Sequence, residues 1–400
     1  MTAGSSIPIA PEIVSPSTPD EVAAALRTAS DARRSVQIRG GGSKLDWARN
    51  SQPPEIVLDM RSLNRVLTHA HGDLTATVEA GVRLSDLNAA LGAHGQGLPL
   101  DPPFADRATI GGLLATNDSG PLRHRYGTPR DLVIGVQVAT TDGTLARAGG
   151  QVVKNVAGYD LSKLITGSFG GLATIVSATF KLTPLPVASR TLVLTFSDSA
   201  SQSRAVAAVA ASQLEPVAFE IQAQTPGGAG FMAMLRFASL PGVVAAQIDR
   251  ARVLLAAEAT STTVLEAAEE VEAWSRHSEQ IWRAPGAIVR GSWLPANLAA
   301  AIEELERISG AASIKVEIIG RAAVAAGLIR IDADDATQAQ FIERLRASST
   351  FGNIVIRRGS DELKSRIDVW GPPGDRLPLL MSLKQAFDPH GILSQGRGPL

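Results

Sequence analysis

Cysteine is absent from this chain of 400 residues. Its absence excludes disulfides, a thiol nucleophile, a cysteine-ligated zinc ion and an iron–sulfur cluster. If the protein passes electrons onward, the next carrier must therefore lie on another chain or be a diffusible acceptor.

A large net charge and long hydrophobic runs are also lacking. The formal net charge is −1, so no overall field draws the chain to nucleic acid or to an anionic membrane. No apolar run approaches the ~20 residues of a membrane helix, and residues 1–11 lack the basic and apolar regions of a signal peptide. We therefore expect no nucleic-acid partner, no transmembrane segment and a cytoplasmic location.

The composition is that of an ordinary globular protein, with 44% hydrophobic and 19% charged residues, and the length suits two or three domains. Residues 1–187 mix helices and strands with glycine-rich segments and end near Pro184-Leu185-Pro186. Residues 188–375 show a β-α-β-β-α-β order twice, which is typical of ferredoxin-like units. Residues 376–400 predict a helix and an extended tail. The pattern predicts an α+β fold with these three divisions.

The first glycine cluster, residues 39–44, follows a predicted strand. Its three glycines allow main-chain N–H groups to converge on one point, as in a nest that binds phosphate. Ser43 adds a hydroxyl, and Arg39 or Lys44 adds positive charge. A plain surface turn remains the alternative. The cluster is not a Rossmann fingerprint, because the glycines are contiguous and no helix is predicted after them.

Two further clusters of small residues follow. Residues 109–120 form a long stretch for which we predict neither helix nor strand, with Thr109, Asn117 and Ser119 as polar side chains. Such a lining suits a flat ligand that lies against main chain, although a loop packed on its own domain is the alternative. The third cluster, residues 154–161 and 167–175, places glycine beside apolar residues just before a predicted strand. This arrangement can offer the edge of the main chain to a ligand. The alternative is that the strand only forms part of the core.

Taken in order, these segments resemble the PCMH-type FAD-binding domain of the vanillyl-alcohol-oxidase family. The resemblance rests on "RGGGSK", "DPPFADRATIGGLLATNDSG", "RYGTPRDLVIGVQVATTDG" and "GSFGGLATI", and it is strongest in residues 36–182. The motifs "VVKNVAGYDLSKL" and "AFDPHGILSQGRGPL" resemble the D and E subunits of glycolate oxidase, and the short second half and "DVWGPP" favour the E subunit. The implied fold is a PCMH-type FAD-binding domain of two α+β subdomains, an antiparallel-sheet cap of ferredoxin-like units, and a tail returning to the FAD domain.

The resemblance implies FAD as the cofactor. Relatives with covalently attached flavin use a histidine or cysteine near the glycine loop, where this chain has Ser43, so we expect noncovalent FAD. The third motif departs from the common G-x-E-G-x-L-G, because Phe169 and Ala173 replace its glutamate and last glycine. The residues that the resemblance assigns to FAD binding are Arg39, Gly40, Gly41, Gly42, Ser43, Lys44, Asp101, Pro102, Thr109, Gly111, Gly112, Asn117, Ser119, Gly120, Gly167, Gly170 and Ile175.

The implied function is that of an FAD-binding subunit of a glycolate oxidase complex, which oxidises a small 2-hydroxy acid. Its expected partners are a D-type FAD subunit and an iron–sulfur subunit, which can also bring the complex to the inner face of the membrane. Two alternatives stay open: a non-catalytic, FAD-stabilised assembly subunit, and a flavoenzyme similar to UDP-N-acetylenolpyruvoylglucosamine reductase.

The catalytic residues stay unassigned at this stage. Oxidation of a 2-hydroxy acid needs a cation for the carboxylate and a base for the hydroxyl. Residues 190–376 hold a single histidine, His277, with no H-x-G-D-G or H-x-H cluster, and we expect no metal site. Candidate substrate contacts, each with an alternative role as a strand-edge or loop charge, are Arg290, Lys315, Glu317, Arg321 and Arg366, together with the basic cluster Arg123, His124, Arg125 and Arg130.

Overall fold

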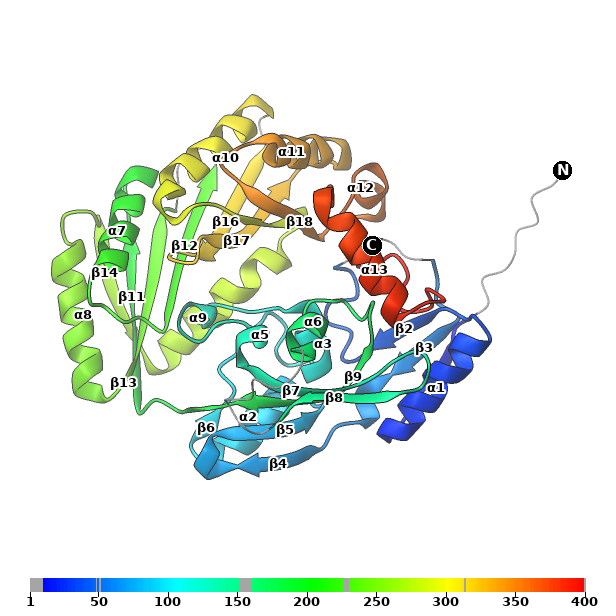
Figure 1. The fold of residues 1–400 in the computed structure, drawn as a ribbon. Coiled ribbons are helices and arrows are strands. Elements are labelled where there is room, and N and C mark those ends of the chain that lie inside the picture. Colours follow the sequence, from blue (N-terminus) through cyan, green and yellow to red (C-terminus); the bar gives the residue numbers. More distant parts are fainter. Residues whose placement is uncertain are drawn as a thin grey trace.

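The computed structural model describes residues 10–47, 49, 52–150, 160–225, 230–312 and 314–398 of the chain. Residues 151–159, which hold most of the "VVKNVAGYDLSKL" motif, lie outside the described part. Figure 1 shows an N-terminal half, coloured blue to green, against which lies a cap coloured green to orange.

The first subdomain is a three-stranded parallel sheet covered by one helix. Thr18 caps the helix by accepting the N–H of Glu21, and Val22 and Leu26 of the helix pack into a core with Leu58. The elements are β1 (Glu12–Val14), α1 (Pro19–Asp31), β2 (Val36–Arg39) and β3 (Ile56–Asp59), in the strand order β1-β3-β2. The glycine loop therefore leaves the end of a parallel strand.

The second subdomain is a five-stranded antiparallel sheet in the order β4-β5-β9-β7-β8. Its strands are β4 (Val66–Ala70), β5 (Thr75–Glu79), β7 (Val133–Ala139), β8 (Leu145–Gly149) and β9 (Thr174–Lys181). The helices and short elements around it are η1 (Met60–Ser62), η2 (His71–Asp73), α2 (Leu84–Gly92), α3 (Ile110–Thr116), α4 (Arg123–Tyr126), α5 (Pro129–Leu132) and α6 (Leu161–Ile165), with β6 (Gln96–Gly97) paired to β10 (Thr183–Pro184). The stretch for which the sequence predicted no regular structure thus contains a helix, α3.

The cap is one eight-stranded antiparallel sheet in the order β14-β11-β13-β12-β16-β17-β15-β18. Its first unit comprises β11 (Ala188–Thr195), α7 (Ser199–Ala211), β12 (Ala218–Thr225), β13 (Met232–Ser239), α8 (Pro241–Leu255) and β14 (Ser261–Glu266). Its second comprises β15 (Ala287–Ser292), η3 (Pro295–Asn297), α10 (Leu298–Ala312), β16 (Lys315–Arg321), β17 (Ala326–Asp332), α11 (Asp335–Ala347) and β18 (Gly352–Arg358). The two units join where β12 pairs with β16, which confirms the predicted pair of ferredoxin-like units.

The long helix α9 (Ala267–Arg283) connects the two units and covers the opposite face of the sheet from the other cap helices. Phe219 of β12 belongs to the main core with α7, α8, α10 and α11, whereas its neighbour Ala218 packs with Met234 and Trp274 of α9. Adjacent strand residues point to opposite faces, so the sheet is covered on both sides. Trp282 of α9 stacks on Trp47 of the N-terminal half, with ring centroids 5.2 Å apart.

The C-terminal segment runs back to the first subdomain. α12 (Asp361–Arg366) still packs on α11 and adds Leu363 to the cap core. After it come η4 (Gly374–Arg376) and α13 (Leu377–Phe387), and then an extended stretch. Val36 of β2 donates to the carbonyl of Ile392 and accepts from the N–H of Ser394, each at 2.8 Å. We propose that the domain boundaries lie at residues 187 and 375. No helix in the described part of the chain is both long and apolar enough to cross a bilayer.

Candidate functional site

The glycine loop after β2 lies against the residues that lead into α3. A side chain on Gly41 would place its Cβ 1.7 Å from the carbonyl oxygen of Arg107, and Gly42 has a φ of +71°. Both positions therefore require glycine. Among the described residues, the main-chain N–H groups of Gly41, Gly42 and Ser43 donate to no other group. Three adjacent donors are thus available to a ligand.

The first turn of α3 is already satisfied by protein groups. Gly111 donates its N–H to the carbonyl of Ala80 at 2.8 Å, and Gly112 donates to Thr109 Oγ1 at 3.4 Å. A Cβ on Gly111 would lie 2.9 Å from that of Ala80. These two glycines therefore contribute close packing and a smooth surface rather than free donors.

A narrow groove runs between the glycine loop, α3 and the start of β9. Its two overlapping parts span about 460 and 510 Å³, including space that is open to solvent. Both parts are lined by Ile38, Gly40, Thr109, Gly112, Ala115 and Phe169; one adds Met60, Ala80, Gly111, Gly170, Ala173 and Ile175, and the other adds Gly41, Gly42, Ser43, Lys44, Leu45, Thr116 and Arg397. Nine of the nineteen lining residues are glycine or alanine, and two cations, Lys44 and Arg397, stand at one end.

A second space of about 670 Å³, here called the arginine cavity, lies between the N-terminal half and the cap. The loop after α3 forms one wall, and α9 and strands β15 to β18 form the other. Four arginines line it: Arg123, Arg290, Arg321 and Arg357. Arg321 donates to the carbonyl of Ser119 at 3.0 Å. The side chains of the other three have no hydrogen-bond or ion-pair partner among the described residues.

Of these unpaired arginines, Arg357 is buried, and Arg123 and Arg290 are half-buried. Arg357 is 6% exposed, its Nη1 has no hydrogen-bond partner in the part of the chain that the structure describes, and its guanidinium lies over the ring of Trp47 at 5.1 Å. Burial lowers the pKa of Arg357 to about 10, and the charge of Arg290 adds to this effect. Burial likewise lowers the pKa of Arg123 to about 10. Buried charge without a counter-ion is unfavourable, so this cavity suits an anion.

Several acid–base groups border the arginine cavity. Glu220 Oε2 lies 3.2 Å from His277 Nε2, both side chains are buried, and no described residue forms a hydrogen bond with Nδ1 of His277. Asp101 accepts the N–H of Leu122 on both carboxylate oxygens, and burial raises the pKa of Asp101 to about 7. A group that can accept a proton therefore stands beside the cationic wall.

The groove and the cavity adjoin at the end of α3. Phe169 lines the groove, and the guanidinium of Arg357, which lines the cavity, lies 5.8 Å from its ring. Lys44 of the groove lies 3.3 Å from Asp118 of the cavity wall. A long ligand in the groove would thus have one end beside the arginines.

Comparison with known proteins identifies the N-terminal domain. Residues 10–149 match the family described as FAD binding domain. The chain carries a PCMH-type FAD-binding domain. Glycolate oxidase subunit GlcD of Bacillus subtilis is 33% identical over 208 residues, covering 52% of this chain and 44% of that protein. Glycolate oxidase subunit GlcE of Escherichia coli is 38% identical over 161 residues, covering 40% of this chain and 45% of that protein.

A third relative is D-lactate dehydrogenase of Archaeoglobus fulgidus. It is 35% identical over 208 residues, covering 52% of this chain and 46% of that protein. The chain thus spans less than half the length of these curated relatives. Among solved structures, an alkyldihydroxyacetonephosphate synthase superposes with a TM-score of 0.70 at 18% identity, covering 95% of this chain and 76% of the other. That likeness extends the shared fold through the cap.

The structure places most of the residues predicted to bind FAD along the groove and the arginine cavity. Asp101, Asn117, Ser119 and Gly120 line the cavity. Arg39, Pro102 and Gly167 line neither space. Arg39 is instead paired with Asp59 at 2.8 Å.

The cap candidates divide in the same way. Arg290 and Arg321 line the arginine cavity, as does Arg123 of the basic cluster. Lys315, Glu317 and Arg366 do not. Glu317 is paired with Arg330 at 3.2 Å, and Arg366 with Glu362 at 2.7 Å.

Sequence reasoning missed Arg357 and the Glu220–His277 pair. Arg357 stands beside Arg358 in β18, and strand alternation points such neighbours to opposite faces. That alternation was the available signal for Arg357, but nothing in the sequence joins Glu220 to His277, which lie 57 residues apart.

Proposed function

We propose that this chain binds FAD noncovalently along the groove and a small 2-hydroxy acid in the arginine cavity. It would oxidise the acid as one flavoprotein subunit of a glycolate oxidase complex. The relatives named as glycolate oxidase subunits, D-lactate dehydrogenase and D-2-hydroxyglutarate dehydrogenase support this substrate class. The observation that carries the proposal is that three buried or half-buried arginines beside the groove, Arg123, Arg290 and Arg357, have no hydrogen-bond or ion-pair partner among the described residues.

The groove has the features that a dinucleotide needs. The free N–H groups of Gly41, Gly42 and Ser43 would hold the pyrophosphate, with Lys44 and Arg397 supplying positive charge. The glycine and alanine surface of α3 leaves room for main chain to approach the ligand closely. No cysteine is present, and Ser43 follows the glycines, so no side chain in this loop is of the kind used for covalent attachment.

The arginine cavity would hold the carboxylate of the substrate. Arg290 and Arg357 come from neighbouring strands β15 and β18, and Arg123 comes from α4 on the facing wall. A carboxylate accepts two parallel N–H bonds from one guanidinium. An acid bound there would relieve the charge that the protein alone leaves unbalanced.

The Glu220–His277 pair is our candidate for removing the hydroxyl proton. If His277 donates from Nε2 to Glu220, its Nδ1 carries a lone pair that can accept the proton, and Glu220 keeps the ring in that tautomer. FAD, when bound, supplies the acceptor for the hydride of the substrate carbon. Arg321 positions the pair, since its Nε lies 3.4 Å from Glu220 Oε1.

Electrons would leave this chain for other subunits. The chain has no cysteine for an iron–sulfur cluster, so onward transfer requires a D-type FAD subunit, an iron–sulfur subunit or a diffusible acceptor. Both D-type and E-type glycolate oxidase subunits are among its relatives, which supports a heteromeric complex.

Anaerobic reduction of the flavin by substrate tests the proposal. The FAD-loaded chain is mixed with glycolate or D-lactate, alone and with its partner subunits, and the visible absorption band of the oxidised flavin is followed. Bleaching in the isolated chain, lost in His277→Gln and Arg290→Gln, supports catalysis here. Bleaching that requires the D-type partner and survives both substitutions would instead assign an assembly role, and bleaching by NADPH alone would assign a reductase.

A further inference from the structure

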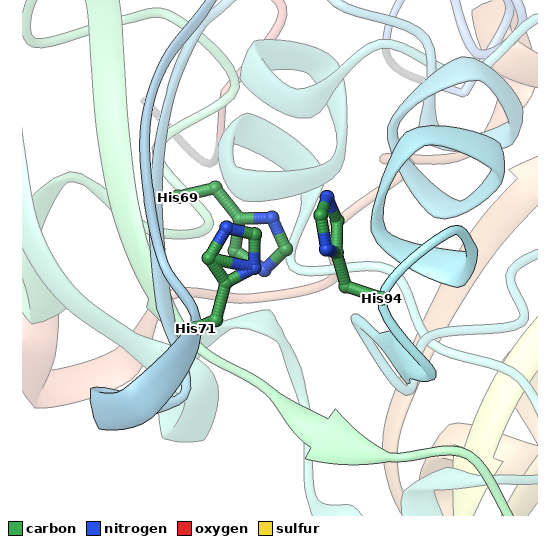
Figure 2. A group of neighbouring side chains, drawn as sticks. All are labelled: His69, His71 and His94. Atoms are coloured by element: carbon green, nitrogen blue, oxygen red, sulfur yellow. The ribbon is translucent and has the colours of Figure 1, made fainter.

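Three histidines form a compact group away from both the groove and the arginine cavity. They are His69 at the end of β4, His71 at the start of η2 and His94 just after α2. Their ring centroids lie 4.1 Å apart for His69 and His71, 3.9 Å for His71 and His94, and 5.2 Å for His69 and His94. Figure 2 shows the three rings gathered at one point from separate segments of the chain. None of them lines either space of the candidate site.

The local fold explains how the rings meet. His69 lies in β4 and His71 begins η2 two residues later, so both rings come from the turn at the end of β4. His94 follows α2, where its N–H donates to the carbonyl of Leu91, and Gly95 with φ +66° turns the chain into β6. The group thus connects two turns of the FAD-binding domain. The H-x-H spacing, which residues 190–376 lack, is present here in the first half of the chain.

A buried amide fixes the state of one ring. Gln96 donates its Nε2 to the carbonyl of His71 at 3.0 Å, so its Oε1 faces Nε2 of His69 at 2.9 Å. An amide oxygen only accepts, so His69 must donate from Nε2, and its lone pair then lies on Nδ1. Ligating histidines commonly donate their other N–H to an oxygen in this way.

The donor set selects the kind of ion. One nitrogen of each ring lies within 4.8 Å of the other two, and no carboxylate belongs to the group as described. Zn–N bonds of about 2.0–2.1 Å require nitrogens roughly 3.4 Å apart in a tetrahedron. His71 and His94 are exposed and can close this difference by small rotations, while half-buried His69 stays in place. Three imidazoles suit zinc-like divalent ions rather than magnesium or calcium.

We propose that His69, His71 and His94 bind one divalent transition ion of the zinc class. Three imidazoles would hold the ion, and the exposed side would leave a position for water or for a side chain of a partner subunit. Because the ligands come from two turns separated along the chain, the ion would fasten β4 and η2 to the end of α2. It would stabilise the FAD-binding domain without taking part in the oxidation.

Zn²⁺ binding to the untagged, FAD-loaded chain tests this proposal. The protein is stripped with a chelator, dialysed and titrated with ZnCl2 by calorimetry, and Co²⁺ is added in parallel to read the coordination geometry from its visible absorption. We expect one saturable equivalent, a tetrahedral Co²⁺ spectrum and a rise in melting temperature with Zn²⁺. The double variant His71→Ala/His94→Ala should lose all three, while its flavin content stays that of the wild type.

His390→Ala is the matched control, because His390 is an exposed histidine outside the group. It should bind Zn²⁺ as the wild type does. Gln96→Leu, which removes the partner of His69, should weaken binding by about 10–100-fold. The proposal is overturned if the wild type takes up no stoichiometric Zn²⁺, if the double variant binds as tightly as the wild type, or if His390→Ala abolishes binding.

Discussion

Replacing Arg357 with methionine should stabilise the ligand-free protein while destroying its affinity for the acid. The drop of the Arg357 pKa from 12.5 to about 10 corresponds to roughly 3 kcal/mol of unfavourable burial. A base whose pKa is lowered by folding carries this penalty in full below the folded pKa, so it acts undiminished at pH 7. Methionine removes the penalty and keeps most of the volume.

The substitution also loses the contacts of the guanidinium with the rings of Trp47 and Phe169, which contribute about 1–2 kcal/mol together. The net effect is a gain of about 1–2 kcal/mol, or roughly 2–8 °C in the melting temperature of the cap. Loss of a buried partner for the carboxylate costs about 2 kcal/mol or more, which raises the KM for the acid by at least about 30-fold.

Arg358→Met is the matched control, because the neighbouring side chain donates to the carbonyls of Trp282, Ala284 and Gly286. Its loss should lower stability by about 2 kcal/mol and leave the KM unchanged. Differential scanning fluorimetry and steady-state kinetics measure both effects. The reasoning fails if Arg357→Met melts below the wild type, as Arg358→Met should, or if its KM is unaltered.

Three further outcomes are expected. Arg290→Gln should raise the Kd for glycolate at least about 10-fold with unchanged flavin content, measured by spectral titration, because a neutral amide cannot balance the carboxylate. Gly41→Ala should lower FAD affinity at least about 10-fold by equilibrium dialysis, since its Cβ would meet the Arg107 carbonyl, whereas Gly72→Ala, with open space around it, should not. Asp101, whose pKa folding raises from 3.8 to about 7, should make stability fall as pH rises from about 4 to 7, by up to about 4 kcal/mol; chemical denaturation of Asp101→Asn should show this slope removed, and an unchanged slope would contradict the assignment.

Much of the fold was predictable because it depends on local pattern. The alternation of strands and helices after residue 188 predicted two ferredoxin-like units, and the structure has them in one sheet. The helix α3 was not predicted, because Gly111 and Gly112 are poor helix formers in isolation. Gly111 is needed because its Cβ would lie 2.9 Å from that of Ala80, and that tertiary contact is not visible in the sequence.

The candidate site was predictable mainly on its N-terminal side. The glycine loop and the residues around α3 form continuous motifs, so sequence could locate them. The arginine cavity draws Arg290, Arg321 and Arg357 from three strands of a sheet whose order is not the order of the chain. Which charges face a cavity depends on strand register and alternation, so Arg290 and Lys315 looked alike until the sheet was known.

The central claim is that FAD occupies the groove with its flavin end beside the arginine cavity. A crystal structure of the chain with FAD and oxalate, a nonreactive analogue of the acid, tests it most directly. We predict the pyrophosphate against the N–H groups of Gly41 to Ser43 and the oxalate in contact with Arg290 and Arg357. Density for the cofactor elsewhere, or oxalate bound away from these arginines, would contradict the account.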